Sequence, residues 1–197
     1  MRTLVMVAWL LIPVGLAAYH YGPGQERLRL DDAADHLREA DRHAAHEEWA
    51  EAAESYDQAL RLLPADRVQD ARRIRLERAK AQMLARQLPA AHADLKALVE
   101  ELKEDGKSDP KLLAEARSTL ANSQYYMTWL MRLEGLPREV WEPEVEAARQ
   151  TYRMLAEQSE TAGDARTARK HEEDLESTVR LARMDLGELQ GLPLPSQ

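Results

Sequence analysis

Histidine and carboxylate side chains are the groups of this sequence best suited to metal or acid–base chemistry. His36, His43 and His46 follow one another at spacings of seven and three residues, with Asp35 and Glu47 close by. These spacings place the histidines roughly on one helix face. A zinc site needs three or four ligands that converge on one point. We interpret these histidines as solvent-facing or packed between helices, and we predict no metal site.

Sequence motifs of enzymes are missing from the chain. The sequence has no P-loop, nucleophile elbow, HExxH zinc motif or glycine-rich loop. Cysteine is absent, which excludes disulfides, thiol nucleophiles and iron–sulfur clusters. The acidic run at residues 171–176 is interpreted as a solvated helix face. We therefore predict a protein that is not an enzyme and has no cofactor; a metal-dependent or catalytic role that needs His43 is the less favoured alternative.

The composition predicts an acidic, helical chain. The 197 residues carry a formal net charge of −8, which disfavours a nucleic-acid partner because phosphates would be repelled. A local group of arginines at 72, 73, 75 and 78 is interpreted as one solvated helix face. Phe is absent, and Ala and Leu, which favour helix, fill the apolar positions. An all-α fold is expected.

An uncharged apolar run, residues 4–18, follows Arg2 at the N-terminus. With Tyr19 to Tyr21 it approaches the roughly 20 residues that span a bilayer. We predict that residues 1–24 are a signal anchor that enters the membrane through residues 4–21, or else a cleaved signal peptide. Either way the following domain is expected outside the cytoplasm, membrane-anchored in the first case and exported as a soluble protein in the second.

Helix-terminating residues divide the rest of the chain. Asp31 or Asp32 is expected to begin the first helix, and Asp66 with Gln69 suggests a capping box. Pro137 and Pro143 are expected to frame an irregular piece. The expected helices span about 31–46, 48–63, 66–86, 89–103, 110–134, 144–161 and 165–186. Short links make neighbouring helices antiparallel, and residues 187–197 are expected to form a flexible tail.

Two segments repeat one pattern of small and bulky residues. In residues 33–66, small residues stand at positions 8, 20 and 27, a bulky residue at 24 and proline at 32; these are Ala40, Ala52, Ala59, Tyr56 and Pro64. In residues 72–105 the positions 8, 20, 24 and 27 hold Ala79, Ala91, Leu95 and Leu98. This pattern resembles the tetratricopeptide repeat, a helix pair of about 34 residues.

A third, degenerate repeat at about 114–160 fits this resemblance after an insertion of about 15 residues. Ala121, Ala148, Tyr152 and Leu155 occupy its positions 8, 20, 24 and 27. The helix at 165–186 would act as the polar cap that such arrays need. The resemblance implies an α-solenoid of about three helical hairpins over residues 25–186, and a generic helical bundle is the alternative.

The resemblance also implies a binding groove lined by the first helix of each repeat. The groove positions of the family hold charged, polar and apolar residues here, which suits a peptide or protein partner. The groove residues are Leu37, Asp41, Arg73, Lys80, Met83, Asn122, Tyr125 and Tyr126, with Ala44, Ala45 and Leu76 beside them. The family subtype that grips an acidic C-terminus is not matched, because Leu37, Asp41 and Glu77 stand at its basic positions.

The densest aromatic region, residues 125–141, leaves two interpretations open. Its tyrosines and tryptophans either fill the seam between the third hairpin and the last helix or form an exposed patch. The predicted function is an adaptor, a non-catalytic scaffold whose groove recruits a protein or peptide. The alternative is a self-associating structural protein of the membrane surface, a homo-oligomer in which an exposed tyrosine and tryptophan patch makes the contact.

Overall fold

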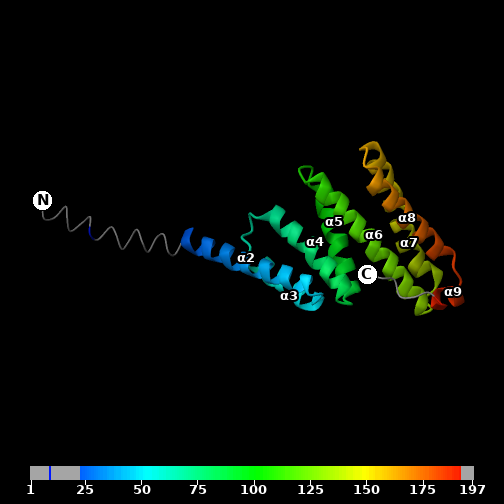
Figure 1. Cartoon of the computed structure of the whole chain (residues 1–197), viewed down its shortest axis with the longest axis horizontal. Coiled ribbons are helices and arrows are strands. Elements are labelled where there is room, and N and C mark those ends of the chain that lie inside the picture. Colours follow the sequence, from blue (N-terminus) through cyan, green and yellow to red (C-terminus); the bar gives the residue numbers. More distant parts are fainter. Residues whose placement is uncertain (1–8, 10–22, 192–197) are drawn as a thin grey trace.

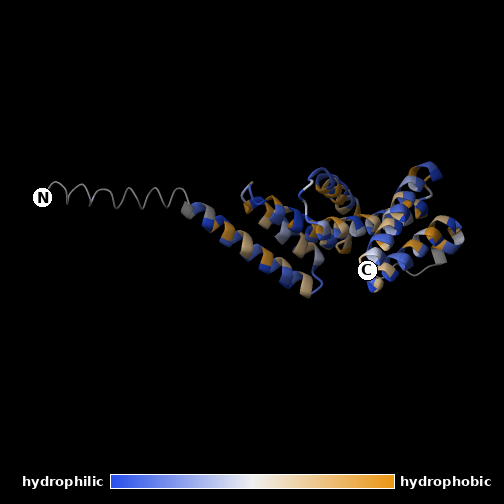
Figure 2. Ribbon diagram, turned by 90° about the horizontal axis from the view of Figure 1, so that it is seen from above, coloured by the Kyte–Doolittle hydropathy of each residue, from blue (hydrophilic) through white to orange (hydrophobic). Residues whose placement is uncertain are grey.

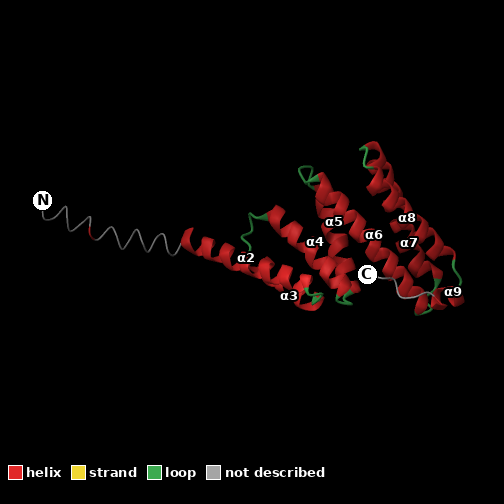
Figure 3. Ribbon diagram, viewed as in Figure 1, coloured by secondary structure: helices red, strands yellow, loops and turns green. Residues whose placement is uncertain are grey.

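A computed structural model describes Trp9 and residues 23–191, and every regular element of these residues is an α-helix (Figures 1 and 3). The expected all-α class is therefore confirmed for this part of the chain. The helices are α2 (Pro23–Ala45), α3 (Trp49–Leu62), α4 (Val68–Leu84), α5 (Leu88–Glu104), α6 (Pro110–Leu133), α7 (Arg138–Thr161), α8 (Ala165–Arg183) and α9 (Leu186–Gly191).

The helices form one row in chain order. From α2 to α8 each helix packs mainly against its neighbours in the chain, and the links between them are short, so neighbours run antiparallel (Figure 1). Smaller contacts join alternate helices, α4 to α6 and α6 to α8. The short helix α9 folds back onto α6. The fold is thus held together by neighbour-to-neighbour interfaces along the row.

The hydrophobic core follows this row as four clusters of buried residues. Hydrophobic and hydrophilic residues alternate along each helix, as amphipathic packing requires (Figure 2). One buried cluster joins α2, α3 and α4, and a larger one joins α4, α5 and α6. Two smaller clusters continue it from α6 to α7 and from α6 to α8 and α9. Consecutive helices therefore share core residues, and no helix pair of residues 23–191 forms a separate core.

Alanines at two repeat positions are completely buried between helices. The alanines at repeat positions 8 and 20 all have 0% exposed surface: Ala40, Ala79 and Ala121, and Ala52, Ala91 and Ala148. The residues at positions 24 and 27 are 0% to 7% exposed: Tyr56, Leu95 and Tyr152, and Ala59, Leu98 and Leu155. A methyl group at the contact lets two helix backbones come close, and the larger side chains fill the space beside it.

Several helix ends follow local rules visible in the sequence. Asp109 caps α6 by accepting a hydrogen bond from the backbone N–H of Lys111 at 2.9 Å, and Pro110 takes the first helical position. After α6, Gly135 has a φ of +74°, and the N–H of Leu136 donates to the carbonyl of Met131 at 2.9 Å. This is a Schellman motif, in which glycine tolerates the left-handed conformation.

Other helix boundaries differ from the sequence prediction. Helix α2 begins at Pro23, eight residues before Asp31, because proline is tolerated in the first helical turn and residues 25–30 all favour helix. The capping box at Asp66 does not form; Arg67 is the N-cap of α4, and its side chain donates to Asp70 at 2.7 Å. Pro143 does not end an irregular piece but lies inside α7.

The predicted tail boundary also changes. The cap helix ends at Arg183, and the boundary predicted between residues 186 and 187 falls inside α9. Leu189 of α9 has 0% exposed surface and packs with Trp129 and Leu181. The first residues of the predicted tail are therefore part of the packed domain.

The predicted membrane segment, residues 4–21, lies outside the described residues apart from Trp9. Within the described part of the chain, no helix has the length and apolar character needed to cross a bilayer.

Candidate binding surface

Helices α4, α6 and α8 share one face of the row, because these alternate helices contact one another. On α6, Glu115, Asn122, Tyr126 and Leu130 follow at spacings of seven, four and four residues, and each is exposed or half-exposed. These spacings place the four side chains in one stripe along the helix. We call this surface, with Lys80 of α4 and Asp174 of α8 beside the stripe, the α4–α6–α8 face.

Lys80 joins α4 to α6 on this face. Its ammonium nitrogen lies 2.7 Å from a carboxylate oxygen of Glu77 and 2.6 Å from one of Glu115. Partial burial lowers the pKa of Lys80, but these two hydrogen bonds outweigh burial and the net pKa is raised. Lys80 is thus charged and compensated at neutral pH, and this end of the face is closed by an ion-paired cluster.

Two tyrosines lie at the middle of α6. The rings of Tyr125 and Tyr126 meet edge to face, with centroids 5.5 Å apart and an interplanar angle of 84°. Tyr126 packs against the α4–α5–α6 core, whereas Tyr125 packs with the cluster of Trp129, Leu181 and Leu189. Burial raises the pKa of both phenols, so both are neutral donors at physiological pH.

Asp174 of α8 lies near these tyrosines and is half-buried. Burial raises its pKa, against the opposing effects of Lys170 and His171, and its charge in turn raises the pKa values of Tyr126 and Tyr152. One turn earlier, His171 is buried beside Tyr152 with ring centroids 6.2 Å apart. His171 and Asp174 are therefore not part of a solvated face, which corrects the interpretation of residues 171–176 for these two positions.

The other predicted groove residues are scattered. Leu37 and Ala44 pack into the α2–α3–α4 cluster, and Asp41 accepts a hydrogen bond from the Tyr56 hydroxyl at 3.1 Å. Leu76 and Met83 are core residues of the next cluster. Arg73 is exposed and lies 3.4 Å from a carboxylate oxygen of Asp109, and Ala45 is exposed at the end of α2. Of the predicted set, Lys80, Asn122 and Tyr126 lie on the α4–α6–α8 face.

The tryptophans of the aromatic region are buried. Trp129 is 7% and Trp141 is 9% exposed, so both fill the space between helices, as the first of the two interpretations predicts. The guanidinium of Arg132 lies over the Trp141 ring, 4.9 Å from its centroid, and donates to the backbone carbonyls of Leu181 and Met184. Arg132 of α6 therefore contacts both α7, through Trp141, and the C-terminal end of α8, through the two carbonyls.

A polar cluster between α5, α6 and α7 was not found from the sequence. His92 Nδ1 lies 3.1 Å from the Ser123 hydroxyl, and His92 Nε2 lies 3.7 Å from Glu144, which accepts from Gln124 at 3.1 Å. The order Ser–His–Glu is that of a hydrolase triad. However, Ser123 has 0% exposed surface and its hydroxyl donates to the Leu120 carbonyl at 2.7 Å.

This cluster is therefore interpreted as a buried hydrogen-bonded contact between helices and not as a catalytic triad. Burial lowers the pKa of His92 despite the nearby carboxylate of Glu144, which favours a neutral imidazole. No substrate atom could reach the Ser123 oxygen without separating helices. The four residues come from three helices at irregular spacing, so no sequence motif could have indicated them.

The predicted histidine group does not form a metal site. His43 Nδ1 lies 2.6 Å from Glu48, and His36 Nδ1 lies 3.4 Å from Glu39. His46 is exposed. Among the described residues, no three histidine, aspartate or glutamate side chains converge as metal ligands would.

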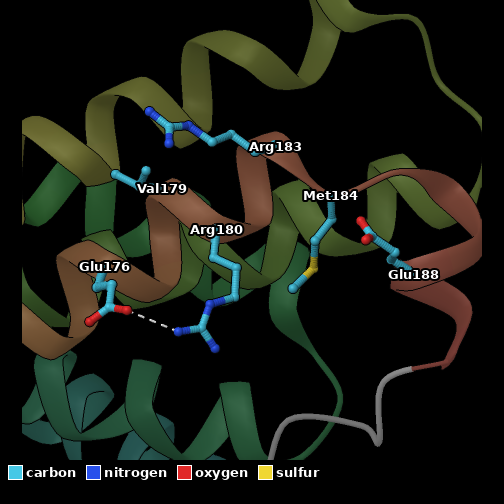
Figure 4. A pocket seen from close by; sticks show the side chains of 6 residues that line it. All are labelled: Glu176, Val179, Arg180, Arg183, Met184 and Glu188. Atoms are coloured by element: carbon cyan, nitrogen blue, oxygen red, sulfur yellow. Dashed lines mark hydrogen bonds and ion pairs between the residues drawn. The ribbon is translucent and has the colours of Figure 1, made fainter.

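A hollow of about 600 Å³ lies where α8 meets α9. Its lining residues are Glu176, Val179, Arg180, Arg183, Met184 and Glu188. Figure 4 shows Arg183 and Val179 on one side of α8 and Glu176 and Arg180 on the other, where these two form an ion pair at 3.0 Å. Its charged groups do not converge, so the hollow has no defined ligand chemistry.

Comparison with known proteins assigns no family. The sequence matches none of the protein-family models, and the search of curated proteins found no match.

Proposed function

We propose that this chain is a tetratricopeptide-like α-solenoid, with about three helical hairpins and a cap, that acts as a non-catalytic scaffold. The observation that carries this proposal is the burial of the repeat positions. All twelve residues at positions 8, 20, 24 and 27 of the three repeats are at most 7% exposed. A generic helical bundle would not require small residues at the same places in successive hairpins.

The turns inside the first two hairpins support the same register. Glu47 and Arg86 have φ values of 60° and 62°, and both stand at position 15 of their repeats. In the two turns the N–H of Glu48 donates to the His43 carbonyl at 2.9 Å, and that of Gln87 to the Gln82 carbonyl at 2.8 Å. The side-chain pattern and the backbone thus repeat together.

The α4–α6–α8 face is the proposed binding surface for a peptide or protein segment. It offers the apolar surfaces of Tyr126 and Leu130 beside the amide of Asn122, with charged groups on both flanks. Tyrosine is enriched at binding hot spots because it combines a large apolar ring with a hydroxyl. Such a surface suits a protein segment better than a small metabolite, which needs an enclosed pocket.

The membrane assignment rests on the sequence. Residues 4–21 would anchor the chain and place the helical domain outside the cytoplasm, so the scaffold would act at a membrane surface. Cleavage of the same segment, which would release a soluble domain, is the alternative.

Self-association is the second candidate function. Leu130, Leu136 and Val140 are 37%, 38% and 47% exposed around the turn from α6 to α7. Exposed apolar groups at one end of a hairpin favour a contact with a second copy. Burial of Trp129 and Trp141, however, removes the tryptophans from any such interface.

The test combines mass and peptide selection. The mass of the full-length chain would be measured in solution, and the chain would be used to select binders from a displayed library of random 12-residue peptides. Tyr126→Ala should abolish binding of the selected peptides, whereas Val140→Ala, an exposed apolar truncation elsewhere, should not. A discrete oligomer that selects no peptides would contradict the scaffold proposal and favour self-association.

A further inference from the structure

Helix α9 is held in place mainly by one side chain. Leu189 has 0% exposed surface, whereas Leu186 and Glu188 of the same helix are exposed. Leu189 packs with Trp129 of α6 and Leu181 of α8. A helix of six residues has little stability of its own. Release of α9 would leave the interfaces from α2 to α8 intact, because α9 packs mainly on α6.

The surface beneath α9 is apolar and open along one edge. Trp129 and Leu181 are buried in it, and Tyr125, Leu133 and Met184 pack around them. We call these five residues the α9 seat. Met184 also lines the hollow of about 600 Å³ where α8 meets α9, and its side chain points into that space (Figure 4). An incoming protein segment therefore reaches the edge of the seat while α9 is still in place.

The seat contains a polar group that α9 does not satisfy. Trp129 is 7% exposed, and its Nε1 atom is buried without a hydrogen-bond partner among the described residues. The indole N–H is only a donor, and a buried tryptophan usually finds an acceptor for it. An occupant that brings an oxygen acceptor would therefore complement the seat better than α9 does.

A cation beside Trp129 indicates the kind of acceptor. Arg132 lies one helical turn after Trp129 on α6, so both side chains occupy one side of this helix. The Arg132 guanidinium donates to the backbone carbonyls of Leu181 and Met184, and no carboxylate of the described residues forms an ion pair with it. A carboxylate is the acceptor that would pair with this guanidinium and also accept from the indole N–H.

The two acids at the start of α9 are engaged with each other's backbone. The Asp185 carboxylate accepts a hydrogen bond from the N–H of Glu188 at 2.7 Å, and the Glu188 carboxylate accepts from the N–H of Asp185 at 2.9 Å. Helix α9 thus brings a leucine to the seat, while its carboxylates serve its own capping box. It is an incomplete ligand for the surface that it covers.

We propose that the α9 seat is a second binding site, for a protein segment that places a leucine where Leu189 lies and an aspartate or glutamate beside Trp129 and Arg132. Helix α9 covers this site in the free protein, and the segment displaces α9. Displacement requires that the segment bind better than α9, and the added carboxylate contacts provide this difference. The residues of the seat are distinct from those of the α4–α6–α8 face, so the site goes beyond the surface proposed above.

The test compares two substitutions in α9 of the full-length chain. Leu189→Asp should release α9, because it puts a charge into the apolar seat. Leu186→Asp is the matched control, because it adds the same charge at an exposed leucine of the same helix. The Leu189→Asp chain would select binders from a displayed library of random 12-residue peptides. The enriched peptides should contain a leucine near an acidic residue. We expect them to bind this chain at least about tenfold more tightly than they bind the wild-type and Leu186→Asp chains.

Two further measurements locate the bound peptide. Trp129→Phe in the Leu189→Asp chain removes the indole donor and should weaken an enriched peptide about tenfold, but should leave its variant with alanine in place of the acidic residue within about twofold. Circular dichroism checks that this chain remains folded. In nuclear magnetic resonance spectra of the Leu189→Asp chain, the indole N–H signal of Trp129 should shift when the peptide binds. The signal of Trp49 should not, because α3 packs on α2 and α4.

The outcomes separate this inference from the scaffold proposal. Equal affinities for the Leu189→Asp and Leu186→Asp chains would show that α9 covers no binding site, and a failure to enrich any peptide, or enrichment without acidic residues, would also refute the inference. Peptides that Tyr126→Ala abolishes while the Trp129 signal stays in place would belong to the α4–α6–α8 face, so the scaffold would stand without this site. A wild-type dimer that Leu189→Asp dissociates would mean that the occupant is α9 of a second copy, which would overturn the proposed partner.

Discussion

Replacing Ala91 with leucine tests the close approach of helices on which the repeat proposal depends. Ala91 has 0% exposed surface and packs in α5 with Leu76 and Ala79 of α4. Leucine adds three carbon atoms at a contact with no free space. Overpacking of a core costs roughly 1–3 kcal/mol when side chains can shift. Because Ala91 is completely buried among core side chains, we expect a loss at the upper end of this range, about 3 kcal/mol.

A control for this change lies two residues along the same helix. Ala93 is exposed, and leucine has nearly the helix propensity of alanine. Ala93→Leu should therefore change the free energy of unfolding by less than about 0.5 kcal/mol. For a chain of this size, about 1 kcal/mol shifts the melting temperature by roughly 2–4 °C, so Ala91→Leu should melt about 6–12 °C lower.

Thermal unfolding of both variants would be followed by circular dichroism at 222 nm. Urea titrations would give the slope of the free energy of unfolding against urea concentration for each variant. Equal slopes would show that the unfolded states are alike and that the difference lies in the native packing. If Ala91→Leu melts within about 2 °C of Ala93→Leu, leucine fits at this contact. The alanine at position 20 would then have no packing role, and the repeat register would lose its main support.

Three further perturbations test other contacts. Arg132→Gln should remove a charged donor from two α8 carbonyls and cost about 2 kcal/mol, with amide exchange rising first in α9; uniform exchange across the chain would contradict this. Glu47→Gly should stabilise the chain by up to about 1 kcal/mol, because glycine tolerates the positive φ of this turn; a lower melting temperature would contradict the turn geometry. Arg72 is 5% exposed, so the interpretation of the arginines as one solvated face is wrong for it; its guanidinium donates to Glu101 at 2.8 Å and to Asp105 at 2.5 Å. Arg72→Met should therefore cost about 2 kcal/mol at pH 7. Burial raises the pKa of Glu101, but hydrogen bonds from Arg72 and Arg75 outweigh burial, so the net pKa of Glu101 is lowered. The stabilisation by the pair of Arg72 and Glu101 is therefore fully present above the ordinary carboxyl pKa of 4.5 and is lost as the pH falls through the lowered pKa. If Arg72→Met lowers the free energy of unfolding as much at pH 3 as at pH 7, measured by urea titration, the proposed role of the Glu101 charge is wrong.

Local rules account for the parts of the fold that the sequence predicted. Asp109 followed by Pro110 begins α6, and Gly135 ends it, because each residue satisfies backbone groups within one helical turn. The buried alanines recur at the same spacing in the first two hairpins, Ala40 to Ala52 and Ala79 to Ala91, because both hairpins bury the same positions between their helices. Such features depend on neighbours a few residues apart, so a sequence contains all the information needed to find them.

Tertiary contacts account for the parts that it did not predict. Pro143 was expected to interrupt the chain, yet α7 continues through it because Trp141 before it and Val145 after it are both buried. Helix α9 is fixed by the burial of Leu189 and by a capping box between Asp185 and Glu188, whose N–H groups donate to each other's carboxylates at 2.9 and 2.7 Å. The capping signature was present in the sequence and could have been found.

Charge compensation is the property that the sequence could least reveal. The acidic run at 171–176 resembles any solvated helix face, and its other acids, Glu172, Glu173 and Glu176, are indeed exposed. Asp174 differs because it is half-buried, and its charge raises the pKa of Tyr126, which lies 48 positions earlier in the chain. A period of 3.6 residues identifies the buried side of one helix, but it does not identify which residues of other helices lie opposite. Whether a carboxylate has a partner can therefore be decided only once the helices are placed.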